Sequence, residues 1–292
     1  MKPARFDYVA PATLDAAVVA LAAADGAGKL LAGGQSLLPL LNFRMVRPSV
    51  VVDLNGIGEL AFIERRGDAV VIGALTRHRE IEQSPLIAAT LPAMSLAMHH
   101  VAHLAVRNRG TIGGSLCHAD PAAELPMLAV FYDATIVAYG PAGRRRIAAE
   151  DFFVDALTNC LADDEIVVEI EFPVPRHDGW AFEERARRFG DFALAAVAVA
   201  VRREGSRLVQ AHVAVTGVAA TPLRLRALEA QLAGRAIDAG LVDRFSELAM
   251  ASVAPHSDLH ASSHYRRRLV GALAGHAAAT ALAARGRTAA GP

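Results

Sequence analysis

Cysteine, aromatic residues and net charge are all scarce in this chain of 292 residues. The two cysteines, Cys117 and Cys160, form no C-x-x-C pair, which excludes a zinc ribbon and a dithiol redox motif. A [2Fe–2S] cluster normally takes four cysteine ligands, so this chain cannot hold one alone. Because 30 basic residues balance 30 acidic ones, the chain has no electrostatic reason to bind nucleic acid or a membrane surface.

Long apolar runs are missing from both ends of the chain. Residues 1–7 lack the apolar core of a secretory signal. Near the other end, Leu269–Ala284 is rich in alanine, but His276 interrupts it and it is shorter than the roughly 20 residues that span a bilayer. We therefore expect a cytoplasmic protein without an integral membrane segment.

Hydrophobic residues, mostly alanine, valine and leucine, make up 53% of the chain, and its length suits two domains. The best candidate linker is 173–179, where proline, charge and glycine cluster. Short strands and helices precede it. After it come two long predicted strands, Phe192–Val201 and Leu208–Val218, and then three predicted helices. The sequence thus predicts an α+β fold divided into 1–175 and 176–292.

A long helix is predicted over Pro85–His103. On such a helix His99 and His103 are four residues apart and share a face, as metal ligands can. No third ligand is evident in the sequence, so polar residues beside a cofactor or an interface are the simpler interpretation. We predict no metal site in this chain.

Two glycine pairs have flanking residues typical of phosphate-binding loops: Ala32-Gly33-Gly34-Gln35-Ser36 and Thr111-Ile112-Gly113-Gly114-Ser115. Each follows a predicted strand or extended segment, and a serine comes soon after each. Because glycine takes positive φ at little steric cost, consecutive N–H groups can point into one concavity that binds an anion. However, 23 glycines give roughly two such pairs by chance. Spacing alone fits two ordinary tight turns as well.

Other candidates have a functional and a structural interpretation. Gly56–Ala61 fits G-x-G-x-x-A, but a hairpin is predicted after it instead of the helix that a dinucleotide fingerprint requires. Cys117 follows the second loop as either a redox thiol or a packed side chain. The arginine runs 144–146 and 266–268 are solvated charge or docking patches.

The strings AGGQSLLPLLNFRMVRPSVVVDLNGI (residues 32–57) and RNRGTIGGSLCHADPAAELP (residues 107–126) add what spacing cannot. With Glu165–Pro173 and Phe182–Leu194, they closely resemble the medium, FAD-binding subunit of molybdenum hydroxylases. That family includes the aerobic carbon monoxide dehydrogenase flavoproteins and the FAD segment of xanthine dehydrogenase. The resemblance extends over nearly the whole chain.

The resemblance implies a PCMH-type FAD-binding domain over 1–175, with subdomains of about 1–55 and 56–175. A C-terminal α+β domain with an antiparallel sheet and helices would occupy 176–292. In the family both glycine loops hold the FAD diphosphate, an acidic residue after the second loop contacts the sugar or adenine, and a backbone group meets the flavin ring. The cofactor-binding residues implied here are Ala32, Gly33, Gly34, Gln35, Ser36, Val101, Thr111, Ile112, Gly113, Gly114, Ser115, Asp120, Glu124, Val167 and Glu183.

Two of these positions depart from the xanthine enzymes. Glu183 stands at the best match for a lysine that lies near the flavin there, and Val101 aligns with an aromatic residue that stacks on the ring. An acid would not stabilise an anionic reduced flavin as a lysine does, although Arg185, Arg187 or Arg188 would supply a positive charge. The terminal electron acceptor (NAD, a quinone or oxygen) is therefore left open.

The function implied is electron transfer within a heterotrimer, which the family assembles as a dimer of heterotrimers. A large subunit would carry the molybdopterin cofactor and oxidise the substrate, and a small subunit would carry [2Fe–2S] clusters. FAD in this chain would pass the electrons to the acceptor, with no catalytic residue required. The alternatives are a stand-alone FAD oxidase of the same fold family and a scaffold that has lost FAD.

Overall fold

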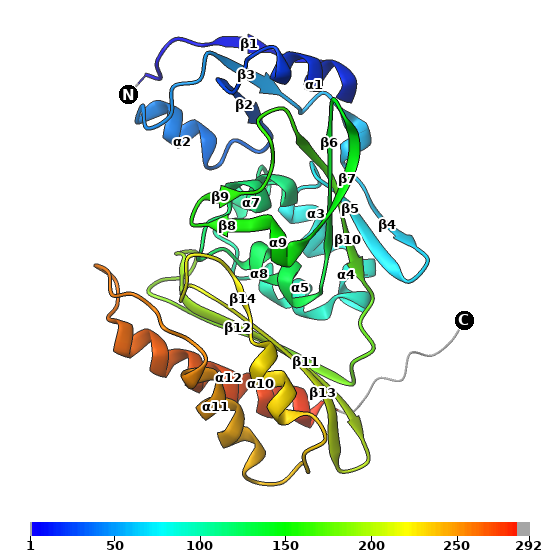
Figure 1. The fold of residues 1–292 in the computed structure, drawn as a ribbon, viewed down its shortest axis with the longest axis vertical. Helices are drawn as coiled ribbons and strands as arrows, with labels where there is room; N and C mark the ends of the chain where they lie inside the picture. Colours follow the sequence, from blue (N-terminus) through cyan, green and yellow to red (C-terminus); the bar gives the residue numbers. More distant parts are fainter. Residues whose placement is uncertain (1, 285–292) are drawn as a thin grey trace. The chain divides into compact units, whose positions relative to one another are not determined.

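The computed structural model describes residues 2–284 (Figure 1). Its contacts divide the chain into two compact units, each built from three segments. Unit 1 consists of Met1–Leu86, His103–Ala119 and Ala134–Pro173, and unit 2 of Ile87–Ala102, Asp120–Asp133 and Val174–Pro292.

A small parallel sheet begins unit 1, with the strand order β1-β3-β2. Its central strand carries consecutive valines, which favour extended backbone because they are β-branched. Thr13 caps the one helix between β1 and β2, because its side chain accepts a hydrogen bond from the N–H of Ala16 at 3.3 Å. These elements are β1 (Asp7–Val9), α1 (Leu14–Ala22), β2 (Gly28–Leu31), α2 (Leu37–Asn42) and β3 (Val50–Asp53).

A larger antiparallel sheet completes unit 1, with the order β4-β5-β10-β6-β7. Its strands are β4 (Ile63–Arg66), β5 (Ala69–Gly73), β6 (Thr135–Gly140), β7 (Gly143–Ala148) and β10 (Ile166–Pro173). The arginine run on β7 forms ion pairs, including Arg145 with Glu165 and Arg146 with Glu171. The shorter elements of the unit are η1 (Gly58–Leu60), α3 (His78–Gln83), α6 (Leu104–Arg107), α7 (Ile112–His118), α9 (Ala149–Phe152), β8 (Phe153–Asp155) and β9 (Thr158–Asn159).

Unit 2 is built on a four-stranded antiparallel sheet of order β11-β12-β13-β14. Valines at alternate positions of β12 and β13 share an apolar core with α10, α11 and α12, so these three helices pack on one face of the sheet. A Cβ on Gly179 would collide with the backbone of α12 at Ala281. The elements are α4 (Pro85–Thr90), α5 (Pro92–Ala97), α8 (Glu124–Phe131), β11 (Gly179–Ala186), β12 (Ala193–Glu204), β13 (Arg207–Thr216), β14 (Leu223–Arg224), α10 (Arg226–Leu232), α11 (Leu241–Ala251) and α12 (Ser263–Ala283).

The predicted α+β class is confirmed, but the predicted helix over Pro85–His103 is wrong. The chain leaves the helical conformation at Leu91 (ψ 59°), because a residue before proline disfavours it, and α5 starts at Pro92. A turn follows α5, and His103 is extended where it caps α6. His99 and His103 therefore share no helix face, which removes the geometric argument for a metal pair.

Two half-buried histidines in unit 2 lie in contact, with the ring centroids of His177 and His212 4.5 Å apart. Burial, followed by the nearby positive charge of Arg224, lowers the pKa of His177 to about 4 and that of His212 to about 3. Neither ring nitrogen of His177 has a hydrogen-bond partner among the described residues. Both rings are therefore neutral in the folded chain near neutral pH.

We predict that acid destabilises unit 2 through this pair. Below a pH of about 6.5 both histidines bind a proton in the unfolded chain, whereas in the folded chain they stay neutral. The unfolded state is therefore favoured increasingly as the pH falls, and the free energy of unfolding decreases. At pH 5.5 the loss from His177 is on the order of 1 kcal/mol. The measurement is the Tm at pH 7.5 and at pH 5.5 for the wild type and for His177→Phe. A pH-dependent drop in Tm as large in the variant as in the wild type would contradict this assignment.

Candidate functional site

The first glycine loop connects β2 to α2 in unit 1. Gly34 has φ 71°, in the left-handed region, whereas Gly33 has no positive φ. The side chain of Gln35 donates to the carbonyl of Gly33 at 3.3 Å, which stabilises the turn. Within the described residues, no hydrogen bond is recorded from the backbone N–H groups of residues 33–36. The loop therefore offers several unused donors close together, as an anion site requires.

The second glycine loop is the start of helix α7. Thr111 caps it by accepting from the N–H of Gly114 at 3.2 Å. The other amides are also engaged: Ile112 donates to Thr76 O at 3.1 Å, Gly113 to Ala74 O at 2.9 Å and Ser115 to Thr111 O at 3.0 Å. Neither glycine has positive φ. The amides of the second loop are therefore bonded within the protein, unlike those of residues 33–36 in the part of the chain that the structure describes.

The glycines at positions 33 and 113 are required by close packing. A Cβ on Gly33 would collide with the carbonyl oxygen of Arg109 and lie 2.8 Å from Gly110 Cα. A Cβ on Gly113 would lie 2.7 Å from the Cβ of Ala74. Real Cβ atoms do not approach other atoms so closely, so the first loop lies directly against the segment that leads into the second. The structure thus brings the two predicted loops together.

Two further residues connect the loops, and sequence reasoning missed both. Arg77 donates to the carbonyl of Arg109 and, at 2.6 Å, to Oδ1 of Asn55. Asn55 in turn donates to the carbonyl of Ala32 at 2.9 Å. Asn55 lies two residues before the end of the string that carries the family resemblance, but nothing in the spacing indicates its partner. Burial, and then the neighbouring charge of Arg109, lowers the pKa of Arg77, so two cations lie close together here.

Val167 lies on β10 and is joined to the second loop through Ala74. The carbonyl of Val168, next to Val167, accepts a hydrogen bond from the N–H of Ala74 at 2.9 Å, and a β-bulge against β6 lies between Val167 and Glu169. Ala74 O accepts from Gly113. The predicted backbone contact near Val167 thus lies in the same unit as both glycine loops, on a strand tied to one of them.

The remaining predicted site residues, Val101, Asp120, Glu124 and Glu183, belong to unit 2. Asp120 accepts from the N–H of Ala122 at 2.9 Å. Val101 and Glu124 are buried. Glu183 forms a 2.9 Å contact with His276 of α12, so it faces the helical layer of the unit.

Glu184, the next residue on β11, points to the opposite face of the sheet from Glu183, because side chains alternate along a strand. Phe182 shares that face and packs on His100, with ring centroids 5.3 Å apart. Burial, and then the charge of Glu124, raises the pKa of Glu184 to about 8. Burial likewise raises the pKa of Glu124 to about 7. Glu184 is therefore a second acid near Glu124, and the sequence did not single it out.

The cysteine after the second loop is a packed thiol. Although Cys117 as a residue is half-buried, burial of its sulfur raises the pKa of the thiol to about 12. The thiolate that redox chemistry needs is therefore unavailable near neutral pH. Among residues 2–284 no group of three or more His, Cys, Asp or Glu is placed to hold a metal ion, and no helix is long and apolar enough to cross a membrane.

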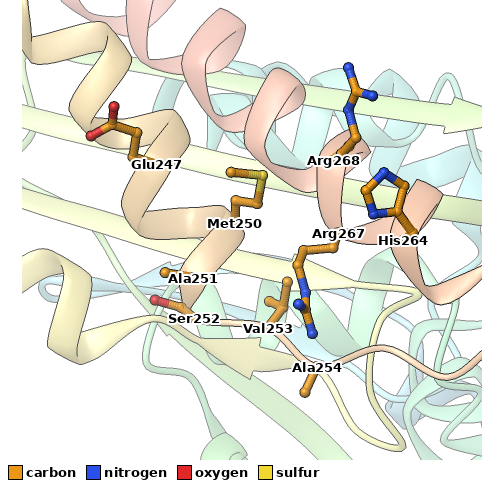
Figure 2. Close-up of a pocket in the computed structure, with 9 residues that line it drawn as sticks. All are labelled: Glu247, Met250, Ala251, Ser252, Val253, Ala254, His264, Arg267 and Arg268. Carbon is orange, nitrogen blue, oxygen red and sulfur yellow. The ribbon is translucent and has the colours of Figure 1, made fainter.

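A cavity of about 540 Å³ lies in unit 2 between α11 and α12. Its lining contains none of the predicted site residues. Figure 2 shows that Arg267 and Arg268 point in different directions, so they do not converge on one anion. The third member of this arginine run, Arg266, is instead buried and donates to the carbonyl of Leu194 at 2.6 Å. The cavity has no feature that connects it with the glycine loops.

Comparison with known proteins agrees with this geometry. Residues 4–175 match the family described as the FAD binding domain in molybdopterin dehydrogenase, and residues 180–281 match the CO dehydrogenase flavoprotein C-terminal domain. The chain is 44% identical over 239 residues to the caffeine dehydrogenase subunit beta of Pseudomonas sp. (strain CBB1), covering 81% of each chain. It is 38% identical to the carbon monoxide dehydrogenase medium chain of Hydrogenophaga pseudoflava, covering 93% of this chain and 95% of that one.

The fold is also shared with a solved structure. Carbon monoxide dehydrogenase from Hydrogenophaga pseudoflava, in a form that lacks the Mo-pyranopterin moiety, superposes with a TM-score of 0.94 at 38% identity. The match covers 98% of this chain and 100% of that chain. These findings confirm the predicted resemblance, the oxidoreductase flavoprotein class and the presence of an FAD-binding domain.

The packing of Gly33 generates a prediction about FAD. Gly33→Ala forces the two loops apart, because the new Cβ meets backbone atoms that cannot rotate away. Such overpacking costs about 1–3 kcal/mol, so we expect FAD affinity to fall by about 5- to 150-fold. The measurement is a fluorescence titration of flavin-free chain with FAD. Gly58→Ala is the matched control, because a Cβ there has no neighbour within 4 Å. Equal affinities for the two variants would contradict the packing argument.

Proposed function

This chain belongs to the family of FAD-binding medium subunits of molybdenum hydroxylases, and we propose that it passes electrons from a partner's [2Fe–2S] clusters through FAD to a terminal acceptor. The observation that carries this proposal is the first glycine loop, whose amides at residues 33–36 have no recorded partner in the described residues and which lies against the second loop. These unused amide donors lie beside Arg77 and Arg109, an arrangement that suits the two negative phosphates of a dinucleotide.

In this proposal the two glycine loops contribute differently to FAD binding. We assign the diphosphate to the N–H groups of residues 33–36, with Ala32 completing the loop. The second loop supplies the hydroxyl of Ser115 and a helix start whose peptide dipoles favour negative charge. Thr111, Ile112, Gly113 and Gly114 shape that surface, because their amide or hydroxyl groups are already bonded.

The other predicted residues contact the rest of the cofactor in this proposal. The backbone near Val167 meets the flavin ring, and Asp120 and Glu124 meet the sugar or adenine part. Val101 occupies the family's ring-stacking position without an aromatic ring. At the family's lysine position, Glu183 is engaged with His276, so we propose that it does not contact the flavin as a free charge.

FAD, when bound, accepts electrons singly and releases them in pairs, which suits a link between one-electron clusters and a two-electron acceptor. The tasks of this chain are to bind the cofactor, orient it and limit the access of water to it. None of the assigned residues acts as a general base.

The partners in this proposal are a large subunit with the molybdopterin cofactor and a small subunit with the [2Fe–2S] clusters. The chain would assemble with them in the cytoplasm as a heterotrimer, two of which pair. The cysteine count supports a separate cluster subunit, because two cysteines fall short of the four ligands that one cluster takes. We also propose that the domain boundary lies within 173–179. Similar chains belong to enzymes named for substrates as different as caffeine and carbon monoxide. We therefore propose that a partner subunit, and not this chain, selects the substrate.

The test is an affinity pull-down of the tagged chain from its native host, with a visible spectrum and metal analysis of the eluate. We expect two co-purifying chains, flavin and iron–sulfur absorbance, about one FAD per chain and molybdenum. A yellow single chain that oxidises an organic substrate without metal would contradict the proposal and establish a stand-alone oxidase. A chain that binds no FAD, alone or in a complex, would leave only the scaffold interpretation.

A further inference from the structure

A single guanidinium connects the two glycine loops of unit 1. One nitrogen of Arg77 donates to the carbonyl of Arg109, two residues before the second loop begins at Thr111. The other donates to the side-chain oxygen of Asn55 at 2.6 Å, and Asn55 donates to the carbonyl of Ala32 at 2.9 Å. Carbonyls of both loops are therefore held by one planar group, directly on one side and through Asn55 on the other.

The second-loop end of this connection is fixed by the backbone around Arg77. His78 donates to the carbonyl of Gly110 at 2.9 Å, and Ile112 donates to the carbonyl of Thr76 at 3.1 Å. The N–H of Arg77 donates to Glu80 at 2.7 Å in the capping box of α3. Because the main chain on both sides is bonded, the arginine side chain has a fixed origin from which it reaches toward the first loop.

The first-loop end is fixed by Asp53 on β3. The carboxylate of Asp53 accepts from the N–H of Asn55 at 2.9 Å and from the hydroxyl of Tyr8 on β1. Although burial raises the pKa of Asp53, the hydrogen bonds from Tyr8 and Asn55 bring it below its usual range, so the group is ionised near neutral pH. Asn55 is thereby oriented with its oxygen toward Arg77 and its amide toward Ala32.

We propose that Arg77, acting through Asn55, is a positioning residue that holds the two glycine loops at the separation required to bind the FAD diphosphate. The inference rests on the proposed FAD function and adds two residues to its site. Without the connection, the loops would still touch at Gly33, but the carbonyl of Ala32 would lose its partner. The amides of residues 33–36 would then no longer be held in one orientation.

A direct contact between the Arg77 guanidinium and a phosphate is the competing role, and the two roles predict different double-mutant behaviour. If Arg77 acts through Asn55, Arg77→Ala and Asn55→Ala weaken FAD binding alike, and the double variant is no weaker than either. If Arg77 binds phosphate itself, Asn55→Ala leaves the affinity nearly unchanged.

The experiment titrates the flavin-free full-length chain and its variants with FAD. We expect Arg77→Ala, Asn55→Ala and the double variant each to bind about 10- to 100-fold more weakly, since each loses the hydrogen bond between the charged Arg77 guanidinium and Asn55. Arg77→Lys should not restore binding, because an ammonium cannot span both partners as the planar fork does. Arg65→Ala, which removes a guanidinium that donates to Gly67 within its own hairpin, should bind as the wild type does.

A second measurement separates positioning from general loss of structure. At saturating FAD, the phosphorus NMR signals of the bound diphosphate should move in the Arg77→Ala and Asn55→Ala variants and stay in place in Arg65→Ala. Wild-type affinity in Asn55→Ala, or additive losses in the double variant, would overturn the positioning role while leaving FAD binding intact. A wild-type chain that binds no FAD would instead overturn the proposed function, and this inference with it.

Discussion

The close approach of two loop backbones, Gly33 against Arg109 and Gly110, is the contact on which the proposed FAD site of unit 1 depends. The loops come from distant parts of the sequence, one after a strand of the small parallel sheet and the other at the start of α7. A side chain at position 33 would separate them, because backbone atoms stand opposite it. Arg77 and Asn55 reinforce this contact, because their hydrogen bonds fix the orientation of the Arg109 and Ala32 carbonyls on its two sides.

This contact gives the two loops unequal roles. The amides of the second loop are used within α7 and against Ala74 and Thr76, so in the proposed site that loop contributes a rigid surface and the helix dipole. The amides of the first loop remain available. A phosphate site built from one rigid partner and one set of free donors is preorganised, because little must move when the ligand binds.

Unit 2 shows how strand alternation decides which acid faces which layer. Glu183 and Glu184 are adjacent on β11, so one contacts His276 of α12 and the other shares a face with Phe182. The family resemblance selects Glu183 by position alone. The structure adds that its carboxylate is engaged, and that Glu184 is the acid whose pKa burial and Glu124 raise.

Much of the fold could be predicted from the sequence, because β-branched runs such as Val50–Val52 and long alternating strands such as β12 leave clear patterns. The prediction of one helix over Pro85–His103 failed because its apolar spacing continues across Leu91, where the residue before Pro92 leaves the helical conformation. The two glycine pairs stay predicted phosphate-binding loops, and the structure adds that the first lies against the segment before the second. Their physical role was not predictable, since it depends on what stands opposite each glycine in space. The connection between Arg77 and Asn55 was not predicted for the same reason, because the two residues are 22 positions apart in sequence and meet only in the folded chain.

The most direct test of the account is amide hydrogen exchange, resolved to individual loop residues, in the chain with and without FAD. The account predicts that FAD slows exchange strongly at residues 33–36 and changes it little at residues 112–115, where the amides are already bonded within the protein. Protection that appears at residues 112–115 and leaves residues 33–36 exchanging freely would contradict it.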